Sequence, residues 1–390
     1  MHRQPHILLI IIISQFAGTS LWFAGNAVLP ELQAKFGLDN HAISSITSAV
    51  QLGFISGTFV FAFLSIADHF CPSRVFFVSS LLAALANYSV IYTRDINLLF
   101  LLRFLTGFFL AGIYPVGMKI AADWYEKELG RALGYLVGAL VLGTAFPHLL
   151  KGDFSLPWRN VLIVTSLIAT AGGILVFAMV PDGPFRRKSS SLNPAILLDA
   201  FKITKFRAAA FGYFGHMWEL YTLWAFLPLI ILLHNKASGL PFNISVASFL
   251  AIAAGALGCV VGGWLSKRFG SARIAFYSLA TSCFCCLISP WMIVSGNLFF
   301  VIFLMIWGIT VAADSPQFSA LVAATAPSEK KGTALTFVIC VGFAITILSI
   351  FIVDKLQQRF NSSTYIFALL SAGPIVGLLT MLPLIRKVRN

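Results

Sequence analysis

Long apolar stretches alternate with short polar connections along the whole of this chain. A helix needs about 20 apolar residues to cross a hydrocarbon core about 30 Å thick. Helices are expected rather than barrel strands, because the stretches are too long and too evenly apolar for strands. We predict twelve membrane-spanning helices, at residues 6–29, 43–66, 74–93, 97–120, 130–150, 158–180, 208–233, 244–265, 273–295, 298–321, 333–353 and 364–385.

The composition and the distribution of charge agree with a membrane protein. Hydrophobic residues make up 58% of the chain and charged residues 11%, which excludes an ordinary soluble domain. If the N-terminus faces the cytoplasm, nineteen of the 27 lysines and arginines fall on the inner side and seven on the outer side. This bias predicts two cytoplasmic termini and a multi-pass protein of the cell inner membrane. It also explains the net charge of +13 without nucleic acid as a partner.

The sequence carries no signature of an enzyme, a cofactor or a metal site. The six cysteines lie within spans or near the cytoplasmic side, where a disulfide framework is not expected. No histidine or carboxylate accompanies the cluster of Cys283, Cys285 and Cys286, which argues against a metal. No nucleotide-binding loop and no nucleophile–base pair is present. We therefore predict a protein that is not an enzyme, has no cofactor and does not use ATP.

One connection, residues 181–207, is longer than the others. It begins with a basic cluster and continues with a partly amphipathic piece that we expect on the inner leaflet, where basic residues meet anionic lipid. We predict an N-terminal half at 1–183, a cytoplasmic linker at 184–207 and a C-terminal half at 208–390.

The two halves resemble each other at a shift of about 200 residues. Gly107 matches Gly308 at a shift of 201, and Gly57 matches Gly255 at a shift of 198. Further matches are Leu21-Trp22 with Leu223-Trp224, Ala111 with Ala312, and Pro115 with Pro316. Because six helices separate the copies, the repeats are parallel, as in transporters whose halves rock around a central site.

Three motifs resemble those of the major facilitator superfamily, and the resemblance extends over essentially the full length. The superfamily's loop signature between spans two and three occurs in a degraded form at residues 64–74 and in a fuller form at residues 262–273. Span four carries Arg103-x-x-x-Gly107, which is similar to the superfamily's arginine motif. The charged residues that we expect in the two gating loops are Asp68, Arg74, Lys267, Arg268 and Arg273.

The resemblance implies an all-α membrane protein with twelve transmembrane helices in two six-helix halves. It also implies a monomer in the lipid bilayer and a central site reached by alternating access. Residues 212–221 in span seven resemble the seventh span of bacterial cyanate- and nitrate-porter-like members. Nitrate porters resemble each other in a buried arginine in span two, another in span eight and a signature in span five. None of these occurs here, so nitrate itself is not expected.

Away from the first two and last two residues of each predicted span, only three full charges occur, namely Arg103, Glu219 and Asp314. A charge at the bilayer centre costs about 2.5–3.5 kcal/mol on insertion scales, so these residues are functional candidates. Arg103 suits an anion contact or a proton-coupling partner in a central cavity. The alternative is a structural ion pair, or a side chain that snorkels to the outer interface.

Glu219 and His216 lie one turn apart on the same face of span seven. An imidazole and a carboxyl group so placed can share a proton, and we predict a proton relay. Alternatively, Glu219 binds substrate directly or holds two helices together. Asp314 lies near Pro316, which removes a backbone hydrogen bond and favours a kink. It suits a proton or cation site at a polar gate, or an ordinary acid at a helix bend.

One face of span one is polar, because Gln15, Thr19, Trp22 and Asn26 follow each other at spacings of 4, 3 and 4 residues. Such a face suits the wall of a cavity, and it would equally suit hydrogen bonding between helices. We predict that Gln15, Trp22, Asn26 and Tyr114 bind substrate together with Arg103.

The sequence therefore predicts a secondary active transporter that takes up a small polar or anionic solute by symport with protons. Arg103 would hold the negative charge, and Glu219, His216 and Asp314 would carry the proton. Three alternatives stay open: an efflux pump for amphipathic compounds, a transporter of metal-chelating siderophores, and a receptor that binds without flux.

Overall fold

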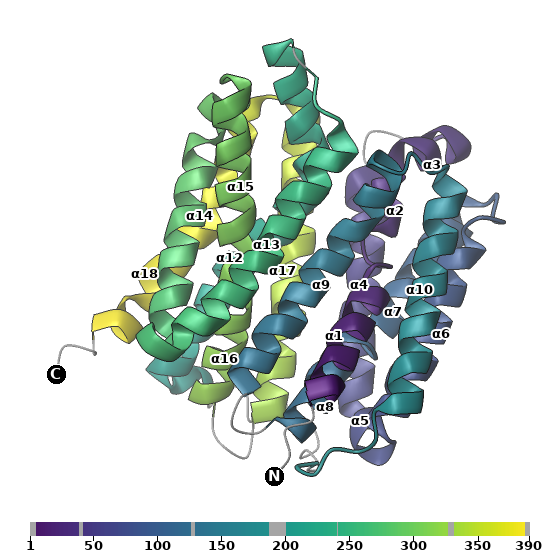
Figure 1. Ribbon diagram of the computed structural model, residues 1–390. Coiled ribbons are helices and arrows are strands. Elements are labelled where there is room, and N and C mark those ends of the chain that lie inside the picture. The colour runs from purple at the N-terminus through teal and green to yellow at the C-terminus, as the bar shows by residue number, and fades with distance from the viewer. Residues whose placement is uncertain are drawn as a thin grey trace. The chain divides into compact units, whose positions relative to one another are not determined.

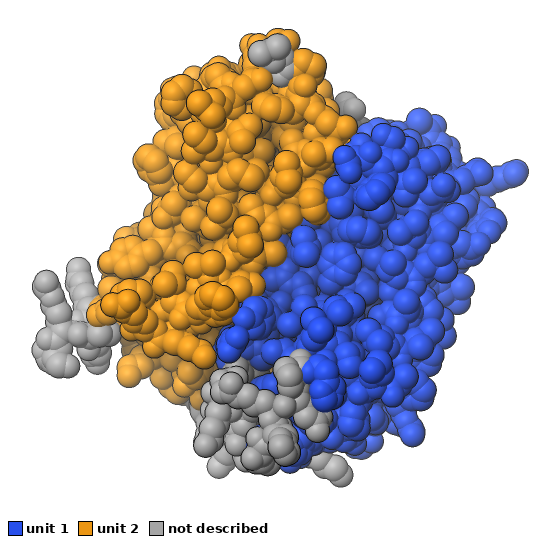
Figure 2. All heavy atoms as spheres, in the orientation of Figure 1, with its two compact units in different colours: residues 1–191 blue, residues 192–390 orange. Residues whose placement is uncertain are grey.

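The computed structural model describes residues 5–38, 42–125, 129–186, 200–239, 241–326 and 331–386, and nearly all of them are helical. The chain divides into two compact units, unit 1 at residues 1–191 and unit 2 at residues 192–390, which Figure 2 colours separately. The predicted domain boundaries at 183 and 208 stay a prediction.

Unit 1 is a bundle in which α4 packs against α7, α6 against α10, and α1 against both α9 and α10. Figure 1 shows the short helix α3 at one end of this unit and α5 at the opposite end. Its helices are α1 (Pro5–Thr19), α2 (Ala24–Ala27), α3 (Leu29–Phe36), α4 (Ala42–Phe63), α5 (Ile66–His69), α6 (Pro72–Ser89), α7 (Ile96–Leu110), α8 (Tyr114–Trp124), α9 (Leu129–Gly152) and α10 (Trp158–Met179).

Unit 2 is built around one long helix, α12, which packs against α18 and α17, while α13 packs against α15. Its helices are α12 (Thr204–Ser238), α13 (Ile244–Phe269), α14 (Ser271–Ile293), α15 (Asn297–Ala313), α16 (Ser315–Thr325), α17 (Lys331–Arg359), the 3₁₀ helix η2 (Thr364–Ser371) and α18 (Ala372–Arg386).

Ten helical segments within the described residues are long and apolar enough to cross a membrane. Of the twelve predicted spans, the first falls on α1, which has 15 residues and ends before a break at residues 20–23. The third falls on α6, which has 18 residues. The count of twelve and the cytoplasmic position of both termini stay predictions.

Two apolar spans are interrupted where a proline begins a new helical segment. α7 ends at Leu110 and α8 carries Pro115 in its first turn, while α15 ends at Ala313 and α16 carries Pro316 in its first turn. Proline is tolerated there because the first N–H groups of a helix have no partner within it. Asp314 therefore lies at a junction between two helical segments.

The internal repeat is visible in close contacts between helix backbones. A Cβ atom on Gly107 would lie 1.8 Å from the carbonyl oxygen of Val50, and one on Gly308 would lie 2.0 Å from that of Ala251. Both members of the second contact follow the first by 201 residues. Only glycine permits such an approach of two helices, so the same packing occurs between α4 and α7 and between α13 and α15.

A second pair of contacts corrects one predicted match. A Cβ atom on Gly57 would lie 2.2 Å from the carbonyl oxygen of Phe108, and one on Gly258 would lie 2.2 Å from that of Ile309. The counterpart of Gly57 is therefore Gly258, at the same shift of 201, and the match to Gly255 at a shift of 198 is wrong. The comparison of the two half sequences aligned Gly57 with a glycine three residues before the correct one. The backbone contacts define the register of the repeat.

Candidate functional site

A histidine and an aspartate meet in the interior of unit 2. His216 Nδ1 on α12 lies 2.9 Å from Asp314 Oδ1, and the two side chains are 1% and 0% exposed. Asp314 reaches this position because it stands at the junction between α15 and α16. The ring of Phe318 lies 5.8 Å from the imidazole, so the pair is enclosed by apolar surface.

Glu219 lies one turn further along α12 and is fully buried. Its Oε1 accepts hydrogen bonds from Ser282 Oγ on α14 and from Trp307 Nε1 on α15, the latter at 2.6 Å. Its Oε2 has no hydrogen-bond partner, although the Cys286 thiol lies beside the carboxyl group. The carboxyl group thus connects three helices of unit 2.

The predicted sharing of a proton between His216 and Glu219 stays a prediction, and in the structure each group contacts other partners. The imidazole contacts Asp314, whereas Glu219 contacts Ser282 and Trp307. The carboxyl groups of Glu219 and Asp314 are nevertheless close enough to interact electrostatically. We call His216, Glu219 and Asp314 together the unit 2 cluster.

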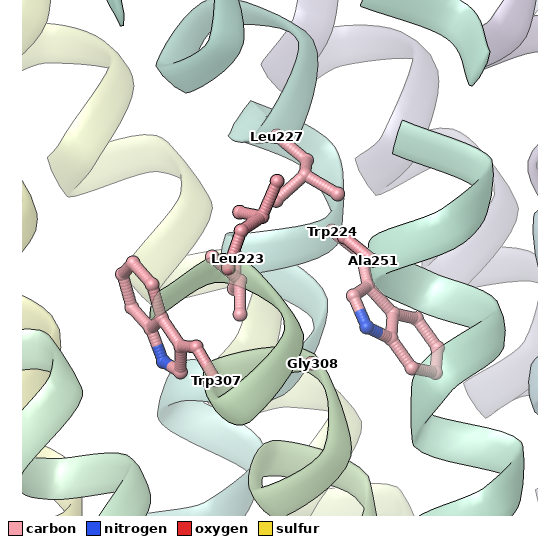
Figure 3. A pocket seen from close by; sticks show the side chains of 7 residues that line it. Leu223, Trp224, Leu227, Ala251, Trp307 and Gly308 are labelled. Carbon is pink, nitrogen blue, oxygen red and sulfur yellow. The ribbon is translucent and has the colours of Figure 1, made fainter. Parts of the chain in front are cut away.

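A narrow apolar crevice, too tight in this structure to admit a water molecule, adjoins this cluster. Figure 3 shows the indoles of Trp224 and Trp307 on opposite sides of it. Trp307 belongs to both features, because its ring lines the crevice and its N–H donates to Glu219. Sequence reasoning treated the aromatics of this region as packing residues and did not find the crevice. The lining residues are Leu223, Trp224, Leu227, Ala251, Leu304, Trp307 and Gly308.

Arg103 on α7 is fully buried in unit 1. Its Nη2 donates to the carbonyl oxygens of Leu21 at 3.2 Å and Trp22 at 3.1 Å, and its Nη1 donates to Asn87 Oδ1 at 2.8 Å. The two carbonyls belong to the break that follows α1, where a helix end carries a partial negative charge. A snorkelling side chain would reach water, so that alternative is wrong.

Within the described parts of the chain, Arg103 has no carboxylate partner. Its Nε is buried and has no hydrogen-bond partner either. Carbonyl groups and one amide therefore surround a full positive charge. Such a charge is incompletely compensated, and burial makes this costly.

Asn87 on α6 holds Arg103 from the other side and was missed by sequence reasoning. Its Nδ2 donates to Thr165 Oγ1 at 3.2 Å and to Ser166 Oγ at 3.0 Å on α10, and to the carbonyl oxygen of Leu162 at 3.2 Å. A chain of hydrogen bonds thus runs from α10 through α6 to α7. An amide inside an otherwise apolar span was the available signal, because such a group needs partners in lipid.

The predicted polar face of span one is buried inside unit 1. Gln15 is 0% exposed, and neither atom of its amide group has a hydrogen-bond partner. Asn26 Nδ2 donates to Thr47 Oγ1 at 2.7 Å. The ring of Trp22 lies 4.8 Å from that of Phe54, and Tyr114 is buried at the start of α8. Substrate binding by Gln15, Trp22, Asn26 and Tyr114 stays a prediction.

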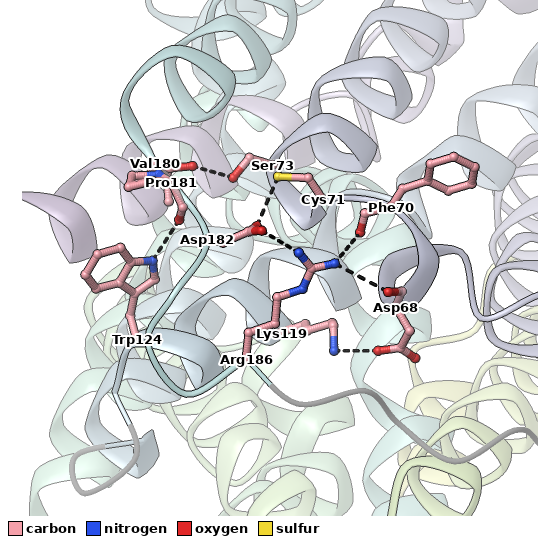
Figure 4. Close-up of polar contacts among 10 residues, drawn as sticks. All are labelled: Asp68, Phe70, Cys71, Ser73, Lys119, Trp124, Val180, Pro181, Asp182 and Arg186. Carbon is pink, nitrogen blue, oxygen red and sulfur yellow. Dashed lines mark hydrogen bonds and ion pairs between the residues drawn. The ribbon is translucent and has the colours of Figure 1, made fainter.

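The first predicted gating loop is held by polar contacts at the α5 end of unit 1 (Figure 4). Lys119 Nζ lies 2.7 Å from Asp68 Oδ1. Arg186, which follows α10, pairs with Asp182 and donates to the carbonyl oxygen of Phe70 at 2.9 Å. Arg74 is exposed and takes no part in this network. The degraded copy of the signature thus still holds an ion pair.

The second predicted gating loop differs from the first. Lys267 and Arg268 are exposed and Arg273 is half-buried. Over the residues that the structure describes, none of the three forms an ion pair, and Arg268 lies 5.3 Å over the ring of Phe269. Among the residues with described positions, the copy that resembles the signature better therefore shows none of the ionic contacts of the first.

The repeat relates the crevice of unit 2 to the arginine of unit 1. At the shift of 201 that the glycine contacts define, Leu304 corresponds to Arg103 and Trp307 corresponds to Thr106. Both Leu304 and Trp307 line the crevice. A guanidinium group in unit 1 thus occupies the place of an apolar wall in unit 2.

The same shift relates the acids of unit 2 to an apolar contact in unit 1. Glu219 corresponds to Gly18, and Asp314 corresponds to Ile113. A Cβ atom on Gly18 would lie 2.6 Å from Ile113 Cγ2, so these two positions are neighbours in unit 1 as well. The units therefore share this packing, but their charged side chains that are 0% exposed differ in sign, with Arg103 in unit 1 and Glu219 and Asp314 in unit 2.

Known proteins resemble this chain in sequence and in fold. A profile described as Major Facilitator Superfamily matches residues 9–350. A curated relative from Cupriavidus necator, "Probable sulfoacetate transporter SauU", is 24% identical over 58% of this chain and 59% of its own length. Another from Pseudomonas putida, "Probable galactarate/D-glucarate transporter GudP", is 28% identical over 48% of this chain and 43% of its own length. The chain thus spans about half the length of these curated relatives.

The fold also has counterparts among solved structures. The crystal structure of the human organic anion transporter MFSD10 (TETRAN) is similar with a TM-score of 0.77. The similarity covers 98% of this chain and 100% of that chain at 14% sequence identity, which shows a common fold alone.

Proposed function

We propose that this chain, which belongs to the Major Facilitator Superfamily, takes up a small organic anion together with protons. The chain is a multi-pass membrane transporter of this type and not an enzyme. The observation that carries the proposal is the division of the charged side chains that are 0% exposed, which are Arg103 in unit 1 and Glu219 and Asp314 in unit 2.

Arg103 is the proposed anion ligand. Its Nη2 is occupied by two carbonyl oxygens, which are weaker acceptors than a carboxylate or a sulfonate. An anionic group that replaces these carbonyls would gain a charge-assisted contact with a guanidinium that lacks a carboxylate partner within the described residues. The named substrates of the two bacterial relatives, sulfoacetate and galactarate or D-glucarate, each carry two acidic groups.

The unit 2 cluster is the proposed proton carrier. With His216 protonated and both acids ionised, the cluster bears a net charge of minus one, and one further proton makes it neutral. A buried charge without a partner costs free energy. Binding of a proton removes this cost, so protonation of the cluster and the conformational change are coupled in this proposal. Alternating access by rocking of the two halves, a monomeric state and a position in the inner membrane belong to the same proposal.

A second candidate function is efflux of an amphipathic compound. The observation that favours it is the apolar crevice between Trp224 and Trp307, since Trp307 also contacts Glu219. If the crevice widens during transport, a lipophilic cation could place its apolar part there and its charge near the carboxyl group. Under this alternative, added substrate leaves cells rather than entering them.

The test is uptake into proteoliposomes that hold the purified full chain. Labelled sulfoacetate, D-glucarate and a lipophilic cation are supplied with and without a pH gradient that is acidic outside. We expect uptake of an anion that the gradient accelerates. Arg103→Gln should lose it, and the exposed Arg359→Gln should keep it as the matched control. Uptake of the cation alone, or full anion uptake by Arg103→Gln, would overturn the proposal.

A further inference from the structure

Three basic side chains gather at the end of unit 1 that carries α3. Lys35 lies in the last turn of α3, Arg94 lies between α6 and α7, and Arg159 lies in the first turn of α10. Lys35 is close enough to both arginines for their charges to interact. Figure 1 shows α3 at the opposite end of this unit from α5. We call these three residues the α3 basic patch.

Aromatic rings and a carbonyl group fix the position of Lys35. Its Nζ donates to the carbonyl oxygen of Ile91 at 3.2 Å. It also lies 4.8 Å from the ring centroid of Phe36 and 4.8 Å from that of Trp158. The guanidinium of Arg159 lies 5.5 Å from the Trp158 ring. One indole therefore contacts two cations, which is a favourable but weak contact at an exposed site.

The rings themselves rest on the apolar interior of unit 1. Phe36, Ile91 and Trp158 pack against a buried cluster that includes Leu32, Leu99 and other residues of α2, α4, α7, α9 and α10. Lys35 and Arg159 are therefore held over one indole on packed helix ends, and the exposed Arg94 lies in the short connection between α6 and α7 beside them.

The charge of the patch is not balanced. The pKa of Lys35 is lowered, first by burial and then by the nearby positive charges of Arg159 and Arg94. Among the residues described by the structure, no carboxylate oxygen lies within 4.0 Å of any of the three. Lys151 in the same unit differs, because it pairs with Glu31. A patch of like charges that repel each other gains free energy when an anion binds.

Its position makes the clustering unusual for a membrane protein. Under the predicted orientation, the outer segments hold only seven of the 27 lysines and arginines, and three of these seven form the patch. Basic residues are not needed there for topology, since the positive-inside rule concerns the cytoplasmic side. Attraction of anions from the outer solution would explain why basic residues cluster at this position.

We infer that the α3 basic patch is an anion-capture site, which concentrates small carboxylates or sulfonates at the outer end of unit 1 before transport. The inference rests on the proposed uptake of organic anions. A patch of one sign raises the rate of encounter with an oppositely charged ligand, and salt suppresses the effect. The Debye length falls from about 30 Å at 10 mM to about 8 Å at 150 mM ionic strength.

The test compares two variants with the same loss of charge. The patch variant is Lys35→Gln/Arg94→Gln/Arg159→Gln. Its matched control removes three exposed cations from predicted outer segments of unit 2. Initial uptake of D-glucarate, well below saturation, is measured in phosphatidylcholine proteoliposomes at the two ionic strengths. The control substitutions are Lys236→Gln, Lys355→Gln and Arg359→Gln.

We expect uptake by the native chain and by the control to fall several-fold from low to high salt. The patch variant should be slow at low salt, insensitive to salt and unchanged in its maximal rate. A patch variant with the native salt dependence would overturn the inference and leave the proposed function intact. Absence of D-glucarate and sulfoacetate uptake in the native chain would instead overturn the proposed function.

A second measurement needs no transport and also identifies the source of the anion. Iodide quenching of Trp158 fluorescence is obtained from the difference between each protein and its Trp158→Phe counterpart, with neutral acrylamide as the reference quencher. We expect strong iodide quenching at low salt that the patch variant loses. Equal quenching in both would overturn the inference. If phosphatidylglycerol in the vesicles abolishes the quenching, the patch binds lipid headgroups and capture of a soluble anion is refuted.

Discussion

Replacing Asn87 by aspartate places a carboxylate against Arg103 with almost no change in shape. Asn87 Oδ1 already lies 2.8 Å from Nη1 of the arginine. The hydroxyl groups of Thr165 and Ser166, which now accept from Asn87 Nδ2, can rotate and donate to the new oxygen. The bond to the carbonyl oxygen of Leu162 is lost, because a carboxylate has no donor.

The magnitude follows from the charges involved. Two opposite unit charges about 4 Å apart attract each other by about 4 kcal/mol at an effective dielectric constant of 20. The Leu162 carbonyl loses one donor, but it lies inside α10 and keeps its helical hydrogen bond, so this loss costs only about 0.5–1.5 kcal/mol. An anion at Arg103 has to compete with this internal partner. A net penalty of about 2.8 kcal/mol would weaken its binding about 100-fold.

The assay is thermal stabilisation of the purified protein by D-glucarate and sulfoacetate, since a ligand that binds the folded form raises its melting temperature by mass action. We expect Asn87→Asp to fold and to lose the stabilisation, and the exposed Asn361→Asp to keep it. Native stabilisation in Asn87→Asp would refute Arg103 as the anion ligand, because a neutralised guanidinium cannot attract a second anion equally well.

Three further changes test the neighbouring features. Glu219→Gln should make uptake insensitive to an imposed pH gradient while exchange of labelled for unlabelled anion persists, and a preserved response to the gradient would exclude Glu219 from coupling. Trp307→Phe keeps a ring but removes the donor to Glu219, so we expect a loss of about 1.5–3 kcal/mol in stability, read as a lower melting temperature. Gly308→Ala places a methyl group against the Ala251 carbonyl and should destabilise by about 1–3 kcal/mol or more, whereas the exposed Gly296→Ala should be tolerated.

Most of the helical spans could be predicted because apolar length in a membrane is set by the thickness of the bilayer. The interruption at Asp314 was also predictable, since Pro316 carries no backbone N–H. The repeat was found from identical letters, but its register required backbone contacts, and Gly57 was matched to Gly255 instead of Gly258.

The partners of the candidate residues were harder to predict than the residues themselves. His216 and Glu219 are neighbours along α12, yet His216 contacts Asp314, which lies almost 100 residues away in the sequence. Likewise, the sequence around Arg103 does not predict that its guanidinium contacts Asn87. A single sequence shows which polar and charged groups are costly to bury. The partners that compensate this cost lie on other helices, and tertiary packing decides which residues they are.

The break after α1 has a consequence for discrimination between anions under the proposed function. A ligand that takes Arg103 Nη2 displaces the Leu21 and Trp22 carbonyls together and leaves both without this donor. Chloride is a single contact atom, so its contact with the guanidinium compensates poorly for the two hydrogen bonds that are lost. A carboxylate or sulfonate presents two or more oxygens to the planar guanidinium and matches what it removes. The unwound segment would thus act as an internal competitor that keeps abundant halides from occupying the transporter.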